Sequence, residues 1–229
     1  MTVKKTQCAI INILKILSER NLLYFYNIPV LQQDNESEMI TWGRHERGAC
    51  YNADGAFGKL FQYRSILENN AFHAILKDGA FIRVSYTFKR GKLKKHSLWY
   101  WPCPLLIPND DIENETPLGA LDLYMSNWEE YLVLRSPMRF DFDVEQQTID
   151  HPASHLHFQA SSCRMGVGHA MSFGTFIKYI FKNFYESEWN NNLSIWADLP
   201  IELDEENKNH IFDTQQNHPH LNWSNSSLP

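Results

Sequence analysis

The clearest regularity in the chain is a strict alternation in the segment "FIRVSYTF", residues 81–88. A period of two is typical of a β-strand, here with Ile82, Val84, Tyr86 and Phe88 on a buried face and with the opposite face mostly in solvent. The turn dipeptides "DG" and "RG" bracket this run, and further β-like runs lie on either side of them. The last run ends in "WPCPL", because proline cannot donate to a β-ladder. The pattern predicts an antiparallel β-meander over residues 71–104.

A second pair of alternating segments, "MRFDFDV" and "SHLHF", lies further along the chain and predicts a β-hairpin over residues 138–159. Each segment has apolar residues on one side and polar residues on the other. Burying both apolar sets in one core places both polar sets on the opposite face. If the strands pair, Asp141 or Asp143 lies across from His155 or His157.

Two segments carry the apolar spacing of amphipathic helices. Ile10, Ile13, Leu14 and Leu17 fit a helix over residues 3–22. A wide apolar stripe behind a capping serine, Ser172, fits another over residues 172–187. The segments "KLFQYRSILENN" and "LGALDLYMSNWEEYL" predict two more helices, whereas "NIPVLQQDNESE" and "IPNDDIENETP" predict polar loops.

Together these elements predict an α+β fold. We expect a curved antiparallel sheet of about five or six strands, with the helices of residues 3–22 and 172–187 packed on one face. The opposite face would carry the polar residues of the hairpin. Residues 1–203 would form a single domain, and the polar, asparagine-rich residues 204–229 would form a mobile tail.

Composition narrows the class of protein. With 229 residues, of which 43% are hydrophobic, the chain can bury a sizeable core. Its net charge of −6 argues against general coating of nucleic acid, although a local basic groove remains compatible with it. The N-terminal apolar run is interrupted by charged residues, so we expect a packed helix rather than a signal peptide, and no stretch is long and apolar enough to span a bilayer.

The cysteine pattern predicts reduced thiols and a cytoplasmic location. Four cysteines are scattered without the paired spacing of a zinc or disulfide framework: Cys8, Cys50, Cys103 and Cys163.

Several pieces of the chain resemble, in order, an uncharacterised bacterial family called domain of unknown function 2290. They are "DGAFIRVSYTF", "HSLWYWPCPL", "RSPMRFDFD", "HPASHLHF" followed by "CR", and "SFGTFIKYIFKNFY", which span most of residues 38–187. The resemblance implies no established activity. It does suggest a genetic setting like that of toxin–antitoxin and phage-defence genes. The family pattern has an arginine where this chain has Ser97.

The hairpin provides the candidate site. Its candidate residues, with the arginine that follows it, are Arg139, Asp141, Asp143, His155, His157 and Arg164. One interpretation is a solvated face with cross-strand ion pairs. A second is a metal-independent acid–base site, in which histidine titrates near neutrality and arginine holds a phosphate. A third is a divalent metal site, with His155, His157 and Asp141 as ligands and no other cofactor implied.

Other candidates have less support. "KRGKLKKH", residues 89–96, is either a solvated hairpin tip or a finger that contacts phosphate. "MGVGHAMS" would offer an anion site before a helix but lacks the lysine of a P-loop. Arg44 and His45 would join the site from another loop. No E-x-K sequence follows "FDFD", which argues against a restriction-type nuclease core.

Two function classes therefore stay open. The first is a toxin-like or phage-defence-type effector that acts on RNA, with a hydrolase or ribonuclease activity in the hairpin cluster. The second is a non-catalytic subunit that binds a protein partner through an exposed aromatic surface and the C-terminal tail. The sequence leaves the substrate, the metal dependence and the oligomeric state open.

Overall fold

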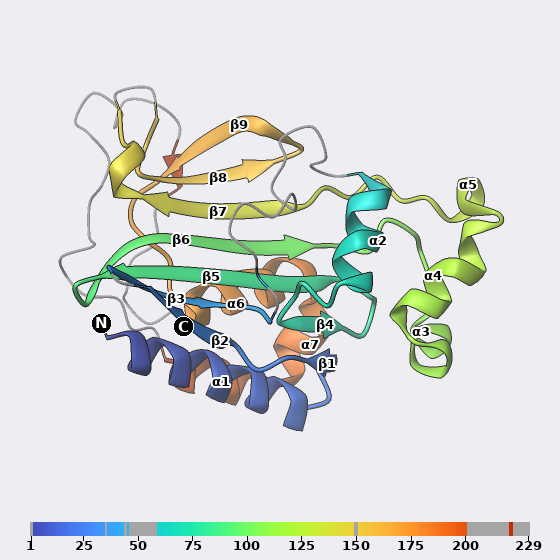
Figure 1. Cartoon of the computed structure of the whole chain (residues 1–229). Helices are drawn as coiled ribbons and strands as arrows, with labels where there is room; N and C mark the ends of the chain where they lie inside the picture. Colours follow the sequence, from blue (N-terminus) through green and yellow to red (C-terminus); the bar gives the residue numbers. More distant parts are fainter. Residues whose placement is uncertain are drawn as a thin grey trace.

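The computed structural model describes residues 2–34, 36–43, 45, 59–148, 151–200 and 220–221. Its centre is a ten-stranded sheet, with helices on both sides (Figure 1). The strands are β1 (Leu23–Tyr26), β2 (Val30–Gln33), β3 (Ser37–Thr41), β4 (Ala74–Leu76), β5 (Phe81–Lys89), β6 (Lys92–Trp101), β7 (Met138–Asp143), β8 (Ser154–Phe158), β9 (Ala160–Val167) and β10 (His220–Leu221). The helices are α1 (Val3–Glu19), α2 (Leu60–Glu68), α3 (Asn109–Glu115), α4 (Pro117–Met125), α5 (Trp128–Tyr131), α6 (Phe173–Phe184), α7 (Glu186–Asn191) and α8 (Leu193–Asp198), with a 3₁₀ turn η3 (Val144–Gln146) after β7.

The strands run β1-β4-β5-β6-β7-β8-β9-β10 across the sheet, and β3 pairs with both β2 and β5. Every pairing is antiparallel except that of β9 with β10. The α+β class is thus confirmed. The sheet is open and uncurled, and it contains more strands than the five or six expected. The expected tail, residues 204–229, lies outside the described residues apart from β10.

Two predicted loops are in fact ordered elements. "NIPVLQQDNESE" contains β2, whose residues are all exposed or half-buried. Because β2 has no fully buried face, its sequence does not alternate between apolar and polar residues. "IPNDDIENETP" contains α3, which buries Ile112 and has Asp110 and Asp111 in its first turn. Carboxylates there interact favourably with the helix dipole, so an acidic sequence can begin a helix.

One face of the sheet packs on α1 and α6. Its side chains include Ile82, Val84, Tyr86 and Phe88 of β5, all 0% exposed as their alternation predicts. Helix α1 adds the set Ile10, Ile13, Leu14 and Leu17, and α6 adds Phe173, Phe176, Ile177, Ile180 and Phe181. Fully burying one such side chain stabilises the fold by roughly 1.5–3 kcal/mol. This face therefore contains the main core.

The opposite face is covered by helices as well, at one end. Buried residues of α2, α3 and α4 form a second core with Phe81, Trp99 and Trp101 of the sheet. Helices therefore cover both faces, not one as expected. The expectation that the second face of β5 is mostly in solvent is also wrong, because Phe81 and Arg83 are both 0% exposed.

The entry to α6 is anchored to the sheet by two buried polar contacts. The Tyr86 hydroxyl donates to the Met171 carbonyl at 3.1 Å, and the Met171 N–H donates to Nε2 of His96 at 2.8 Å. The Ser172 hydroxyl then accepts from the Thr175 N–H at 3.0 Å and caps the helix, as predicted. Among the described residues, no helix combines the length and apolar character needed to cross a membrane.

His96 should make the fold sensitive to acid. Burial lowers the pKa of His96 from 6.5 to about 4, against an opposing attraction from Asp141. Below pH 6.5 the unfolded chain binds a proton at His96, whereas the folded chain does not until about pH 4. Acid therefore stabilises the unfolded state, and the free energy of unfolding falls as the pH drops from 6.5 toward 4. We expect the free energy of unfolding to fall by about 2 kcal/mol between pH 7 and pH 5 through this residue. Urea unfolding of wild type and His96→Gln at both pH values measures it; equal losses in the two proteins would contradict the assignment.

Candidate functional site

The hairpin of β7 and β8 forms in a register that faces Asp141 with His155 and Arg139 with His157. Strand β6 lies on the other side of β7 and places Ser97 beside Asp141 and Trp99 beside Arg139. Because side chains alternate along each strand, all these residues leave the same face of the sheet. The cluster therefore consists of two adjacent rows that run across the strands.

Arg139 belongs to a stack of guanidinium groups and indole rings. The Arg83 guanidinium lies 4.6 Å from the ring centre of Trp42 and 4.7 Å from that of Trp99. The Arg139 guanidinium lies 4.9 Å from the ring centre of the same Trp99. Cation–π contacts of this kind are strongest where water is excluded, and Arg83 is 0% exposed. The stack fixes the position of Arg139 beside Asp141.

Asp141 is the centre of the polar contacts. Its Oδ2 lies 2.6 Å from Nε of Arg139 and 3.4 Å from Nε2 of His157, and its Oδ1 accepts from the Ser97 hydroxyl at 2.7 Å. Burial pushes the pKa of Asp141 upward, but the His157 hydrogen bond and the charge of Arg139 outweigh burial and hold it well below its usual range. Asp141 is therefore ionised at neutral pH.

His155 is held as a neutral imidazole with a defined tautomer. Its Nδ1 lies 2.8 Å from the Pro152 carbonyl oxygen, which can only accept, so Nδ1 has the proton. Burial lowers the pKa of His155 to about 4, although the charge of Asp141 opposes the shift. Nε2 consequently presents a lone pair, and it lies 4.0 Å from Oδ2 of Asp141.

His157 completes a set of three potential metal ligands if a metal displaces the proton that its Nε2 shares with Asp141 at 3.4 Å. One donor atom each from Asp141, His155 and His157 lies within 4.8 Å of the other two. Two imidazoles and one carboxylate are a ligand set used for zinc and for non-haem iron. In such sites the ring nitrogen that does not bind the metal typically donates to a carbonyl or carboxylate, as Nδ1 of His155 does to the Pro152 carbonyl. His155 and His157 are 3% and 1% exposed, so a solvated face does not describe them.

The other candidate residues lie around the cluster. Asp143 is not part of the ligand set, and its Oδ2 lies 3.0 Å from Nζ of Lys95. Arg164 is exposed on β9; after burial, its charge is the main cause that lowers the pKa of His151. His45 stacks on Trp42 with ring centres 4.0 Å apart, so it joins the far end of the stack rather than the ligand set. Arg44 lies outside the described residues.

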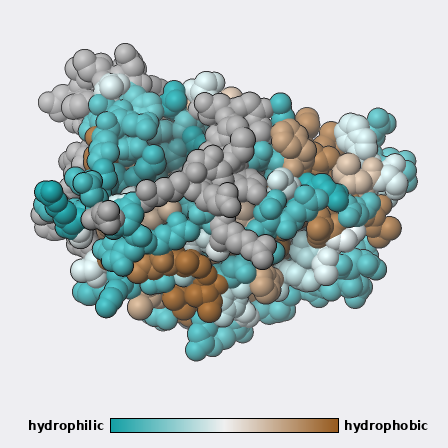
Figure 2. All heavy atoms as spheres, viewed as in Figure 1, coloured by the Kyte–Doolittle hydropathy of each residue, from teal (hydrophilic) through white to brown (hydrophobic). Residues whose placement is uncertain are grey.

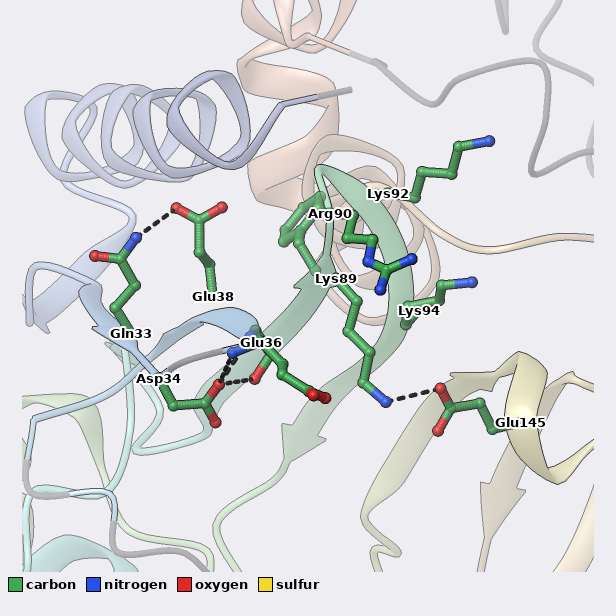
Figure 3. A pocket seen from close by; sticks show the side chains of 11 residues that line it. Gln33, Asp34, Glu36, Glu38, Lys89, Arg90, Lys92, Lys94 and Glu145 are labelled. Atoms are coloured by element: carbon green, nitrogen blue, oxygen red, sulfur yellow. Dashed lines mark hydrogen bonds and ion pairs between the residues drawn. The ribbon is translucent and has the colours of Figure 1, made fainter.

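The basic segment of residues 89–96 borders a different hollow. Figure 3 shows a groove lined on one wall by Lys89, Arg90, Lys92 and Lys94 and on the other by acidic residues of the β2–β3 turn. Lys89 reaches Glu145 of η3 at 2.9 Å, and η3 directly follows β7. The basic hairpin tip is thus adjacent to the end of β7, and not above the histidines.

Three residues of the site were missed by the sequence interpretation: Arg83, Ser97 and Trp99. Ser97 donates to Asp141 and accepts from the Trp99 indole N–H at 2.9 Å. The available signal was the alternation of β5 and β6, which places all three residues on the face opposite Val84 and Leu98. Only the pairing of β6 with β7, which lies far along the chain, shows that this face continues into the cluster.

The family comparison agrees with the extent of these elements. A family model described as "Uncharacterized conserved protein (DUF2290)" matches residues 22–223, which include every strand of the sheet. The searches of curated proteins and of solved structures returned no match.

Two aspartates on the same strand should differ sharply in their effect on stability. Asp141→Asn leaves the Arg139 guanidinium, whose side chain is 12% exposed, without its carboxylate. Breaking such a pair should lower the free energy of unfolding by about 3 kcal/mol. Asp143→Asn is the matched control, because its partner Lys95 is 55% exposed and the loss should stay below about 1 kcal/mol. Denaturant unfolding of both variants measures the difference; losses of equal size would show that Arg139 does not depend on Asp141.

Proposed function

This chain belongs to the DUF2290 family of uncharacterised conserved proteins, and because that family assigns no activity, we propose a function from the cluster alone. We propose that Asp141, His155 and His157 bind a divalent transition-metal ion, and that the chain uses it to cleave phosphodiester bonds in RNA. The observation that carries this proposal is the geometry of His155. Its Nδ1–H donates to the Pro152 carbonyl, and its Nε2 lies 4.0 Å from a carboxylate oxygen of Asp141.

That geometry favours a metal over proton transfer by the histidines. The lone pair on Nε2 of His155 lies near Oδ2 of Asp141, 4.0 Å away, so both atoms can bind one cation in addition to the Arg139 guanidinium, which contacts Oδ2 at 2.6 Å. A general base near neutral pH should also have a pKa near 7. The pKa of His155 is lowered to about 4 by burial, which suits a neutral ligand better.

The cluster supplies cations and a site for a base, but no free side-chain nucleophile. The Ser97 hydroxyl donates to Asp141 and accepts from Trp99, so its proton is already engaged. RNA brings its own nucleophile, the 2′-hydroxyl. A divalent ion held by Asp141, His155 and His157 would supply Lewis acidity that lowers the pKa of a nearby water, and that water would serve as the base for the 2′-hydroxyl. The 2′-oxygen then attacks phosphorus, the bond to the 5′-oxygen breaks, and water returns a proton to that oxygen.

Positive charge around the cluster supports a polyanionic substrate. Arg139 lies beside the ligand set, and Arg164 is exposed on the neighbouring part of β9. Five of the seven residues in "KRGKLKK" are basic, and this tip adjoins the end of β7. Contacts of lysine and arginine with phosphates supply much of the affinity for nucleic acid. In the cell, such an activity would suit an effector of the toxin-like or phage-defence type. The free thiols Cys8, Cys103 and Cys163 support a cytoplasmic location.

A second function is supported by a different part of the molecule. Large apolar side chains are exposed on the segment that contains α3, α4 and α5. They favour the role of a subunit that binds a protein partner, with or without catalysis in the cluster.

Metal binding is the first prediction of the proposal. Titration of the chelator-stripped full chain with Zn²⁺ or Mn²⁺ in a calorimeter should show one tight site. His155→Ala and His157→Ala should each weaken it more than about 100-fold, because each removes a ligand. His151→Ala is the matched control, since its ring packs 4.7 Å from that of His155 but is not in the ligand set. Equal binding by all four proteins would exclude this site.

Cleavage is a separate prediction. The metal-loaded chain should cut a mixed RNA substrate, and the double variant His155→Ala/His157→Ala should lose more than about 100-fold in rate. Cleavage that survives a chelator but not the double variant would replace the metal by acid–base catalysis. A chain that binds metal and leaves RNA intact would refute the proposed activity while keeping the metal site.

A further inference from the structure

Residues 105–134, which we call the acidic arm, differ in charge from the rest of the chain. The arm contains α3, α4 and α5 and projects beyond the end of the sheet (Figure 1). It has seven of the 27 acidic residues and none of the basic ones, so its formal charge of −7 exceeds the −6 of the whole chain. The arm alone therefore makes this protein acidic.

The same arm exposes large apolar side chains. Five of the eleven exposed large hydrophobic residues of the described chain lie on it: Leu106, Leu123, Trp128, Leu132 and Leu134. Leu134 is 98% exposed. Figure 2 shows hydrophobic surface between hydrophilic residues on this projecting part. Single exposed leucines are ordinary, but a set gathered on one small projection is typical of a binding surface.

The arm holds these side chains on an ordered backbone. Leu105 forms an isolated bridge with Leu132, the Leu106 N–H donates to the Tyr131 carbonyl at 2.7 Å, and the Val133 N–H donates to the Pro104 carbonyl at 3.0 Å. These bonds bring the segment of Leu106 alongside that of Leu132. Ile112, Ala120 and Leu121 anchor the helices in the second core. A partner would therefore meet a preformed surface and lose little binding energy to ordering it.

Several carboxylates of the arm are available for a partner. Glu113 pairs with Lys77 at 2.7 Å, and Asp122 pairs with Arg64. Four others form no ion pair within the described ranges: Asp110, Glu115, Glu129 and Glu130. Glu129 and Glu130 follow Trp128 in α5, so negative charge and apolar surface occur in one helix.

We propose that the acidic arm docks a basic amphipathic segment of a partner protein. The apolar residues of the arm would take the apolar face of that segment, and the unpaired carboxylates would pair with its lysines and arginines. The arm's charge repels nucleic acid and anionic membranes. It also disfavours a second copy of this chain, which would bring seven more negative charges. The inference is independent of the chemistry of Asp141, His155 and His157.

The experiment uses the full chain and three labelled synthetic helices of about four turns. The first has leucine on one face and lysine on the other, the second replaces lysine by glutamate, and the third replaces leucine by serine. Fluorescence anisotropy should show binding of the leucine–lysine peptide and much weaker binding of both others. Failure of the first peptide to bind, or equal binding of the second, overturns the proposal.

Variants locate the binding to the arm. Leu134→Ser and Glu129→Lys/Glu130→Lys should each weaken binding at least about tenfold, which corresponds to about 1.4 kcal/mol. The matched controls are Ile28→Ser, an exposed apolar residue outside the arm, and Glu186→Lys/Glu188→Lys on α7. Both should bind as wild type does, and equal losses in the controls would overturn the assignment.

Two further measurements test whether the arm instead binds a second copy of this chain or a membrane surface. A dimer in sedimentation that Leu134→Ser dissociates would assign the arm to a second copy. Binding to phosphatidylcholine vesicles that Leu134→Ser abolishes would assign it to a membrane surface. Either result overturns the proposal. Neither depends on whether the chain binds metal or cleaves RNA.

Discussion

The position of a buried guanidinium between two indole rings determines the arrangement of the polar face. Arg83 has no exposed surface, and removing a full positive charge from water is costly unless other groups replace the solvent. Trp42 and Trp99 do so with the negative faces of their rings. Trp99 then shares its ring with Arg139, so one indole sets the spacing of two cations. The polar face is therefore a tightly packed layer.

The charge state of the cluster follows from that stack. The His157 hydrogen bond and the charge of Arg139 keep Asp141 ionised, while burial keeps His155 neutral, so a carboxylate and an imidazole lone pair coexist in one small volume. The Pro152 carbonyl and the Ser97 hydroxyl fix the orientation of these two groups. Sites that bind a ligand tightly are commonly held in this way before the ligand arrives.

The alternation of apolar residues was sufficient to predict the α+β class and the core faces of β5 and β7. It did not reveal short strands such as β2, because a marginal strand has no buried face to impose a pattern. For the site, alternation correctly grouped Asp141 with His155 and His157. It could not separate Asp143 from them, because Asp143 is two residues from Asp141 on β7 and the alternation assigns both to the same face. Only its ion pair with Lys95 distinguishes Asp143. Ser97 and Trp99 depend on a strand pairing between distant segments, which local patterns do not encode.

The parallel pairing of β10 with β9 has a consequence for the edge of the sheet. Strand edges expose unpaired backbone donors and acceptors, which recruit further strands from other molecules. The Gly168 N–H donates to the Leu221 carbonyl at 2.9 Å, and β10 covers β9 at Gly166 and Val167. These two residues, far along the chain, therefore cover the last two positions of that edge and leave them closed to a strand from another molecule.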